Sequence, residues 1–317
     1  MKIKGFGINA DALKEDDLGQ KKFDLDCLAR NLEHFTDMDF DFVEIPLHRL
    51  EEISDGSFSP SHIEKIRRIL SSFPFKYTVH GPDPLNLKNK EDISSQKENL
   101  IKSIEFAHAL ESEILVFHAG KYAAFKILNS SGSRRQEFSR RTIEKMLALE
   151  REMLYTAAER AEELGVTIAV ENIQPYLDRS PYCYSELLSL LREQVDAVNH
   201  PNIGITLDVG HAFLSASFYR FNFIDEISKT VPYIRHVHIH DNFGRVTKTS
   251  ENGGTELMAE GYGDLHLPMG FGRIPVDKVL SLLHHCPCVI LHEIHSSPKE
   301  YTKEALKLTK GILSEVA

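Results

Sequence analysis

The stretch His236-Val237-His238-Ile239-His240-Asp241-Asn242 alternates histidine with a β-branched residue and ends in an aspartate. Successive side chains of a strand point to opposite faces, so the three histidines share one face of this strand. Neutral imidazole is the commonest metal ligand in proteins. The stretch therefore predicts a strand that contributes to a metal site, and a polar strand end in contact with solvent is the alternative.

Seven further β-rich runs accompany this strand, and helical patterns separate them. Strand–helix alternation implies parallel strands joined by right-handed crossovers, and eight such units in 317 residues are typical of a closed (β/α)8 TIM barrel. An open doubly wound sheet is less favoured because no G-x-G-x-x-G sequence opens a helix. The predicted strands are 4–8, 42–45, 77–80, 114–118, 166–171, 203–208, 234–240 and 289–293.

Helices are expected between these strands. Pro60 suits a first helical turn, and Gly165 ends the longest helix. A long glycine-rich loop from Asp241 to Arg273 follows the seventh strand, and without linkers or low-complexity tracts we expect one domain over residues 1–317. The predicted helices are 26–36, one that opens at 59–61, 93–110, 135–164, 184–198, 223–230, 276–284 and 298–314.

Composition and charge exclude several classes of protein. A hydrophobic content of 42% with 26% charged residues fits a soluble globular protein. The N-terminal residues are acidic rather than apolar, and no apolar run is long enough to span a bilayer, so we expect a cytoplasmic protein without a membrane partner. The net charge of −10 disfavours a broad electrostatic grip on nucleic acid.

Chemically active residues gather at the ends of the predicted strands. In a TIM barrel the active site lies at the carboxyl ends of the strands. The third to the eighth strand all end in such residues, namely His80, His118, Glu171, Asp208, His238 with His240, and Glu293. Two Asp/His pairs, Asp208 with His211 and Asp264 with His266, extend the set.

The resulting ligand set contains nitrogen and oxygen donors and no sulfur, which suits Zn²⁺, Mn²⁺, Co²⁺ or Fe²⁺. It consists of His80, His118, Glu171, Asp208, His211, His238, Asp264, His266 and Glu293. Nine donors exceed the need of one ion and suggest two or three ions with a bridging carboxylate. A hydrogen-bonded polar network that closes the barrel is the alternative.

Residues near this set are expected to have supporting roles. His240 and Asp241 are interpreted as orienting the ligands or facing the substrate, and His236 as a packed or hydrogen-bonded residue deeper in the strand. His292 alternates away from Glu293 and should face the helices. The loop residues Lys121, Arg245, Lys248 and Arg273 are either phosphate contacts or solvated surface, and solvated surface is favoured.

Short blocks at these strand ends carry a family resemblance. They are Tyr77-Thr78-Val79-His80-Gly81-Pro82, Val116-Phe117-His118-Ala119-Gly120, Ala169-Val170-Glu171-Asn172, Leu207-Asp208-Val209-Gly210-His211-Ala212, His238-Ile239-His240-Asp241-Asn242, Asp264-Leu265-His266-Leu267-Pro268 and His292-Glu293. Together they resemble the xylose isomerase-like TIM-barrel superfamily (AP endonuclease family 2). That superfamily contains sugar-phosphate isomerases and epimerases together with apurinic-site endonucleases of the endonuclease IV type.

The resemblance implies two sets of roles. In the isomerase/epimerase pattern Glu171, Asp208, His238 and Glu293 hold one catalytic metal ion, Glu171 and Glu293 exchange protons, and His211 assists at the substrate oxygen. In the endonuclease pattern all nine residues hold three zinc ions. His80, His118 and Glu171 would then bind the first ion. The second ion would be bound by Glu171, Asp208, His238 and Glu293, and the third by His211, Asp264 and His266.

Two enzyme functions therefore stay open. The favoured one is a divalent-metal-dependent isomerase or epimerase of a small sugar or sugar phosphate, with one to three Zn²⁺ or Mn²⁺ ions per chain. The alternative is a trinuclear-zinc phosphodiesterase of the endonuclease IV type, the only reading with a nucleic-acid partner. At the end of the seventh strand this chain reads His238-Ile239-His240-Asp241-Asn242-Phe243-Gly244. The endonuclease subfamily instead resembles His-Leu-Asn-Asp followed by a basic residue. This difference favours the sugar enzyme.

Overall fold

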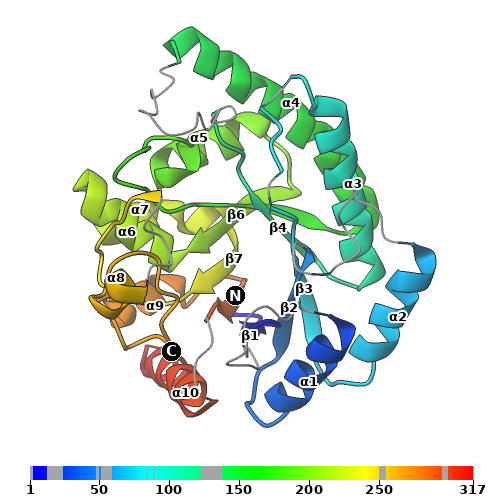
Figure 1. The fold of residues 1–317 in the computed structure, drawn as a ribbon, viewed down its shortest axis with the longest axis vertical. Helices are drawn as coiled ribbons and strands as arrows, with labels where there is room; N and C mark the ends of the chain where they lie inside the picture. The colour runs from blue at the N-terminus through cyan, green and yellow to red at the C-terminus, as the bar shows by residue number, and fades with distance from the viewer. Residues whose placement is uncertain are drawn as a thin grey trace.

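The β-rich runs predicted from the sequence form the strands of a closed parallel barrel with the helices outside it (Figure 1). The computed structural model describes residues 3–12, 24–47, 50, 59–83, 85–88, 90–122, 138–249, 255–294 and 299–316. Each strand pairs in parallel with the next, and β8 pairs with β1 to close the barrel. The strands are β1 (Gly5–Asn9), β2 (Phe42–Pro46), β3 (Lys76–His80), β4 (Ile114–His118), β5 (Thr167–Glu171), β6 (Ile203–Asp208), β7 (Ile234–Ile239) and β8 (Val289–His292).

The helices begin and end where local chemistry favours it. Ser59 caps α2 by accepting a hydrogen bond from the backbone N–H of His62, with Pro60 in the first turn. Gly165 ends α4 in the left-handed conformation at φ 69°, as predicted. The helices are α1 (Leu25–Phe35), α2 (Pro60–Leu70), α3 (Ile93–Ala109), α4 (Arg140–Leu164), α5 (Leu188–Val198), α6 (Val209–Tyr219), α7 (Phe223–Thr230), α8 (Thr255–Ala259), α9 (Val276–Leu283) and α10 (Lys299–Glu315).

The predicted fold class is confirmed, and three helical segments differ from the prediction. Helix α6 was not predicted; it follows β6 directly and is buried along most of its length, so it lacks the apolar stripe that identifies a surface helix. The single turn α8 lies within the loop after β7. The predicted helix 184–198 is divided into a 3-10 turn, Tyr184–Glu186, and α5.

Two predicted helix starts fall on residues that the structure does not describe. Residues 135–137 and 298 lie outside the described ranges, and the corresponding helices are described from Arg140 and Lys299 onward. Among the described helices, none has both the length and the apolar character needed to cross a lipid bilayer.

Strand register places the polar residues at one end of the barrel. His118 on β4 is the register partner of Glu171 on β5, and Asp208 on β6 is the partner of His238 on β7. Val116 and Ala169 share faces with His118 and Glu171, and they pack together in a small apolar cluster deeper in the barrel. On the β4 and β5 side of the barrel, the polar side chains at the carboxyl ends of the strands therefore lie above a small apolar cluster.

A buried ion pair fastens the segment after β3 to the outer helices. Lys88 Nζ lies 2.7 Å from Glu150 Oε1 on α4, and both side chains are fully buried. Gln194 Nε2 donates to Glu150 Oε2 at 3.0 Å, and Lys88 Nζ lies 4.9 Å from the centre of the Tyr184 ring. Because the pair is out of water, each charge depends on the other.

Replacing only one member of this pair should destabilise the protein strongly. In Lys88→Met the carboxylate of Glu150 stays buried without its cation, and we expect the free energy of unfolding to fall by about 3–5 kcal/mol. The double variant Lys88→Met/Glu150→Met removes both charges and should recover most of this loss. Urea unfolding measures both values, and a double variant less stable than the single one would contradict the prediction.

Candidate metal centre

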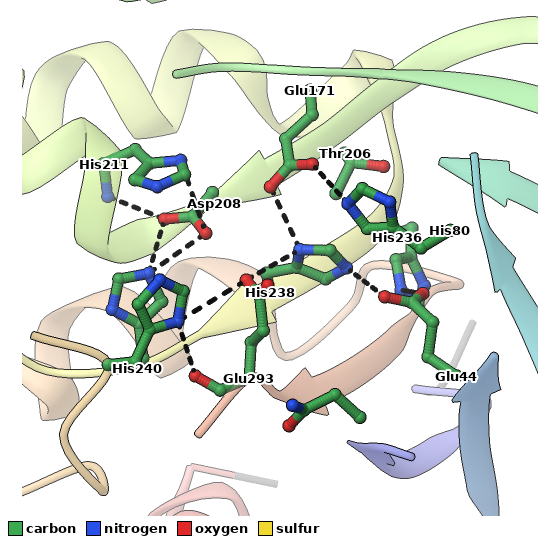
Figure 2. A network of polar contacts seen from close by, with 12 residues as sticks. Glu44, His80, Glu171, Thr206, Asp208, His211, His236, His238, His240 and Glu293 are labelled. Carbon is green, nitrogen blue, oxygen red and sulfur yellow. Dashed lines mark hydrogen bonds and ion pairs between the residues drawn. The ribbon is translucent and has the colours of Figure 1, made fainter. Parts of the chain in front are cut away.

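All nine predicted ligands lie together at the carboxyl ends of the strands, and Figure 2 shows the side chains from different strands turned toward one another. They fall into groups whose candidate ligand atoms lie within 4.8 Å of one another. We name these the β3–β4 group (His80, His118, Glu171), the central group (Glu171, Asp208, His238, Glu293), the loop group (His211, His240, Asp264, His266) and the Glu44 group (Glu44, His236, His238).

The central group is built around the ring of His238. Its Nδ1 lies 3.0 Å from Glu171 Oε1 and 3.2 Å from Glu293 Oε2. The side chain of Glu171 is 1% exposed and that of Glu293 is 19% exposed, so Glu293 is the carboxylate that faces the mouth of the barrel. Burial opposes the ionisation of both carboxyl groups, but His238 and the neighbouring imidazoles hold their pKa values well below the usual range.

Glu171 also belongs to the β3–β4 group through its second oxygen. Glu171 Oε2 lies 2.8 Å from His118 Nε2 and 3.5 Å from His80 Nε2. Nevertheless this buried oxygen accepts no hydrogen bond from the described residues. The carboxylate therefore faces one group with each oxygen, which is the arrangement of a bridging ligand.

The loop group joins two elements that are distant in sequence. His211 lies in the first turn of α6, whereas Asp264 and His266 lie in the loop after β7. Asp264 Oδ2 lies 2.9 Å from Nε2 of both histidines. Burial opposes the ionisation of Asp264, but His266 and His211 hold its pKa well below the usual range.

The chemistry of these donors fits divalent metal ions. Metal-binding histidines usually donate their outer N–H to a carbonyl or carboxylate oxygen, which turns the other nitrogen toward the metal. His80 Nδ1 lies 3.0 Å from the carbonyl oxygen of Gly81, with Nε2 turned toward Glu171. Buried oxygens of Glu171, Asp264 and Glu293 have no hydrogen-bond donor among the described residues. Imidazole nitrogens and carboxylate oxygens that converge in this way suit Zn²⁺ or Mn²⁺.

Glu44 is a site residue that the sequence reasoning missed. Its carboxylate is buried on β2, where Oε2 lies 3.0 Å from His236 Nε2, Oε1 lies 3.0 Å from His238 Nε2, and Thr78 Oγ1 donates to Oε2 at 2.9 Å. Glu44 therefore contacts Nε2 of His238, while Nδ1 of the same ring faces Glu171. A glutamate inside the apolar strand Phe42–Pro46 was the available signal, because a charge on a buried strand requires a partner.

His240 and Asp241 were both expected to orient ligands, and the structure separates them. Asp241 accepts backbone N–H groups from Gly270, Gly272 and Ile274 at 2.9–3.1 Å, so it shapes the loop that carries Asp264 and His266. The ring of His240 belongs to the loop group and could bind a metal itself. Its Nε2 also lies 3.1 Å from both carboxylate oxygens of Asp208, so its role in orienting a ligand stays a prediction.

His236 of the Glu44 group and His292, which lies in none of the groups, are not among the nine predicted ligands. His236 is bound to Glu44, in line with its predicted role, and His292 packs against Phe40 at a ring distance of 5.9 Å. The four basic residues of the loops are exposed: Lys121, Arg245, Lys248 and Arg273.

A cavity of about 660 Å³ lies at the opposite end of the barrel. Lys4, Phe42, Lys76 and Val289 contribute to its lining, and none of the candidate ligands does. Lys4 is already paired with Glu113 at 2.7 Å. This cavity shares no lining residue with the four groups, so the site is assigned by its ligand chemistry.

The chain is similar to known proteins in both sequence and structure. The protein-family model described as "Xylose isomerase-like TIM barrel" matches residues 32–312. Uncharacterized protein MJ1311 of Methanocaldococcus jannaschii is 24% identical over 264 residues, which are 81% of this chain and 75% of that protein. Uncharacterized protein MJ1614 of the same organism is 30% identical over 201 residues, 62% of this chain and 64% of that protein.

Solved structures with the same fold include three named as epimerases or epimerase-like. A D-tagatose 3-epimerase-like protein has a TM-score of 0.70 at 23% identity, and the match covers 100% of this chain and 98% of that chain. D-psicose 3-epimerase from Clostridium cellulolyticum has a TM-score of 0.66 at 14% identity, covering 99% of both chains. The 3-keto-D-glucoside 4-epimerase of E. coli has a TM-score of 0.65 at 14% identity, covering 98% of this chain and 100% of that chain.

Metal binding to these groups should release protons. Burial opposes the charged imidazolium, but nearby carboxylates raise the pKa of His118 to about 10 and that of His266 to about 10. Both rings are therefore protonated in the metal-free protein at neutral pH, and a ligand must be neutral. The apparent affinity for Zn²⁺ should rise as the pH increases from neutral toward about 10, where the metal no longer competes with protons.

Calorimetric titration with Zn²⁺ in two buffers of different ionisation enthalpy measures the released protons. His292→Asn is the control, because burial lowers the pKa of His292 to about 3 and that ring is already neutral. Equal heats in both buffers near neutral pH would contradict the prediction.

Proposed function

Since the chain belongs to the xylose isomerase-like TIM-barrel family, we propose that it is a divalent-metal-dependent isomerase or epimerase of a sugar or sugar phosphate. The observation that carries the proposal is the placement of Glu171 and Glu293 at 3.0 and 3.2 Å from one nitrogen of His238. Two carboxylates beside one candidate metal ligand suit proton transfer at a substrate held there. The likeness in fold to proteins named as sugar epimerases supports the same reaction class.

Glu171, Asp208, His238 and Glu293 would hold the catalytic ion, Zn²⁺ or Mn²⁺. When bound, such an ion acts as a Lewis acid toward a substrate carbonyl and its neighbouring hydroxyl. The chain's own contribution is to keep the donors oriented. Glu44 holds His238 from below, and Asn172 Nδ2 and Oδ1 bind the backbone of Asp208 at 2.9 Å each.

Glu171 and Glu293 are the proposed proton carriers. Both pKa values are lowered, so each carboxylate is ionised at neutral pH and can accept the proton next to the carbonyl. The glutamate that takes this proton becomes a carboxylic acid and can return the proton to the neighbouring carbon. Return to the opposite face of the same carbon would use the other glutamate after it has taken a proton from solvent. The role of His211 at the substrate oxygen stays a prediction, since its Nε2 lies 2.9 Å from Asp264.

One observation favours a second candidate function, a trinuclear-zinc phosphodiesterase of the endonuclease IV type. The β3–β4, central and loop groups together contain every ligand that the endonuclease pattern requires. In that reading the three groups would surround a phosphate of nucleic acid. The net charge of −10 and the residues that follow His238 count against it.

The proposed proton pair predicts solvent exchange that depends on both glutamates. The metal-loaded protein is incubated in D₂O with a panel of ketoses and ketose phosphates, and deuterium incorporation is followed by NMR. Glu171→Gln and Glu293→Gln, compared at matched metal content, should each lose about 10²–10⁴-fold in exchange rate because a general base is removed. Glu260→Gln, at an exposed carboxylate in the loop after β7, is the control and should keep the rate.

The same preparations are tested on DNA that contains an abasic site. Cleavage of that DNA without deuterium exchange in any sugar would establish the phosphodiesterase and contradict the isomerase or epimerase. Exchange in a sugar that survives Glu293→Gln at full metal content would remove the proposed role of Glu293.

A further inference from the structure

We propose that the guanidinium group of Arg179, in the segment after β5, binds an oxyanion of the substrate and thereby selects a charged sugar over a neutral one. The inference rests on the proposed function and narrows its substrate class to sugars that carry a phosphate or a carboxylate. Arg179 belongs to none of the four groups of candidate ligands, and it is half-buried beside two tyrosine rings.

The guanidinium group of Arg179 packs on two buried aromatic rings. Its Cζ lies 4.2 Å from the centre of the Tyr176 ring and 4.2 Å from the centre of the Tyr182 ring, and these residues are 7% and 5% exposed. Rings on opposite faces of the cation would be roughly twice that distance apart, whereas their centres are 5.8 Å apart. Both rings therefore lie to one side of the cation, which they stabilise through their π electrons.

The hydrogen-bond donors of Arg179 are unused by the described part of the chain. Nε is buried there without an acceptor, and no described carboxylate forms an ion pair with the group. The two terminal nitrogens also lack an acceptor among these residues, but they are not buried, so a ligand can reach them. Taking a charge out of water costs free energy unless an opposite charge or hydrogen bonds replace the water. The tyrosine rings supply neither an anion nor a carbonyl oxygen.

Other half-buried arginines use their donors within the protein. Arg151 donates to Gln194 Oε1 at 2.9 Å, and Arg192 donates to Thr230 Oγ1 at 2.8 Å and to Glu226 Oε2 at 3.0 Å. Compared with these, Arg179 is held in place while its polar end is left for an acceptor from outside. Arginine presents parallel N–H groups that match two oxygens of a phosphate or a carboxylate.

The segment after β5 positions Arg179 at the carboxyl ends of the strands. It begins directly after the candidate metal ligand Glu171, the last residue of β5. Gln174 joins the two rings, because its Nε2 donates to Tyr176 Oη at 3.0 Å and its carbonyl oxygen accepts from Tyr182 Oη at 2.9 Å. The rings that hold the guanidinium group are thus fastened three residues beyond a candidate ligand.

The Tyr176 phenol is within electrostatic reach of both Arg179 and the loop group. Burial raises the pKa of Tyr176, the charge of Arg179 lowers it, and the charge of Asp264 raises it. The segment also meets the loop after β7, because the backbone N–H of Leu177 donates to the carbonyl oxygen of Thr247 at 2.9 Å. A sugar whose reacting carbons lie at the central group would therefore extend its charged end toward Arg179.

A purely structural role for Arg179 would be to fasten the segment after β5 to the two rings. Loss of such a role would weaken the binding of charged and neutral ligands alike. Loss of an anion contact weakens only the binding of the charged ligand, by roughly 10–100-fold for hydrogen bonds to a charged group. Ligands of similar shape that differ in charge therefore separate the two roles.

The unaltered, metal-loaded protein is tested first, with polyols that have no carbonyl group and cannot react. Calorimetry compares glucitol, glucitol 6-phosphate and gluconate, and NMR follows the ¹H–¹⁵N signal of Arg179 Nε, assigned by its loss in Arg179→Lys. We expect a charged probe to bind more tightly than glucitol and to shift this signal with the same affinity. Preference for glucitol 6-phosphate identifies a sugar phosphate as the substrate class, and preference for gluconate identifies a sugar acid.

Three results with the unaltered protein would overturn the proposal. They are equal affinities for the three probes, no binding of any probe, and binding of a charged probe that leaves the Arg179 signal in place. The last result would mean that the anion is held by the metal ion alone.

Variants then assign the contact to Arg179. We expect the affinity for the preferred charged probe to fall roughly 10–100-fold in Arg179→Gln and less in Arg179→Lys, which keeps the charge without the parallel N–H groups. The affinity for glucitol should stay the same in both. Arg245→Gln is the matched control, since Arg245 also packs on a tyrosine ring, 5.2 Å from the centre of Tyr262, but already donates to the carbonyl oxygen of Glu260. An equal loss for charged and neutral probes, or an equal loss in Arg245→Gln, would contradict the role of Arg179.

These binding measurements do not depend on turnover. If no sugar exchanges deuterium while a charged probe binds at Arg179, the proposed reaction fails and the anion site stands. If sugars exchange deuterium and the charged probes neither bind preferentially nor shift the Arg179 signal, the reaction stands and the anion site fails.

Discussion

The mouth of this barrel depends on the compensation of buried negative charge. Glu44, Glu171 and Asp208 are all at most 2% exposed, and an ionised carboxylate out of water requires a positive partner. Imidazoles supply that partner, because each of these carboxylates lies close to at least one histidine ring. Protons and metal ions compete for the same nitrogens, so protonation and metal binding are two ways to meet one requirement.

Shared residues make the groups interdependent. Glu171 faces the β3–β4 group with one oxygen and the central group with the other, and His238 links the central group to Glu44 below it. Asp208 belongs to the central group and accepts from His240 of the loop group. A change at any of these residues therefore alters two groups.

Most of the fold was predictable because strand–helix alternation leaves few topologies open. The exceptions have physical reasons: α6 is buried along most of its length and shows no apolar stripe, and α8 is a single turn inside a loop. The nine predicted ligands were found by their position, since the carboxyl ends of parallel strands meet at one end of a barrel. Glu44 was missed because it sits within a strand and not at its end.

The sequence by itself determined the barrel and the residue types at its mouth, because both follow from local periodicity. Only the tertiary structure decided how those residues are grouped and which nitrogen of each imidazole faces inward. Ring orientation is set by hydrogen bonds between distant segments, such as His211 to the carbonyl of Asn172 and His266 to that of Glu293. Such contacts have no sequence pattern, since they depend on strand register and on the path of the loop that Asp241 holds.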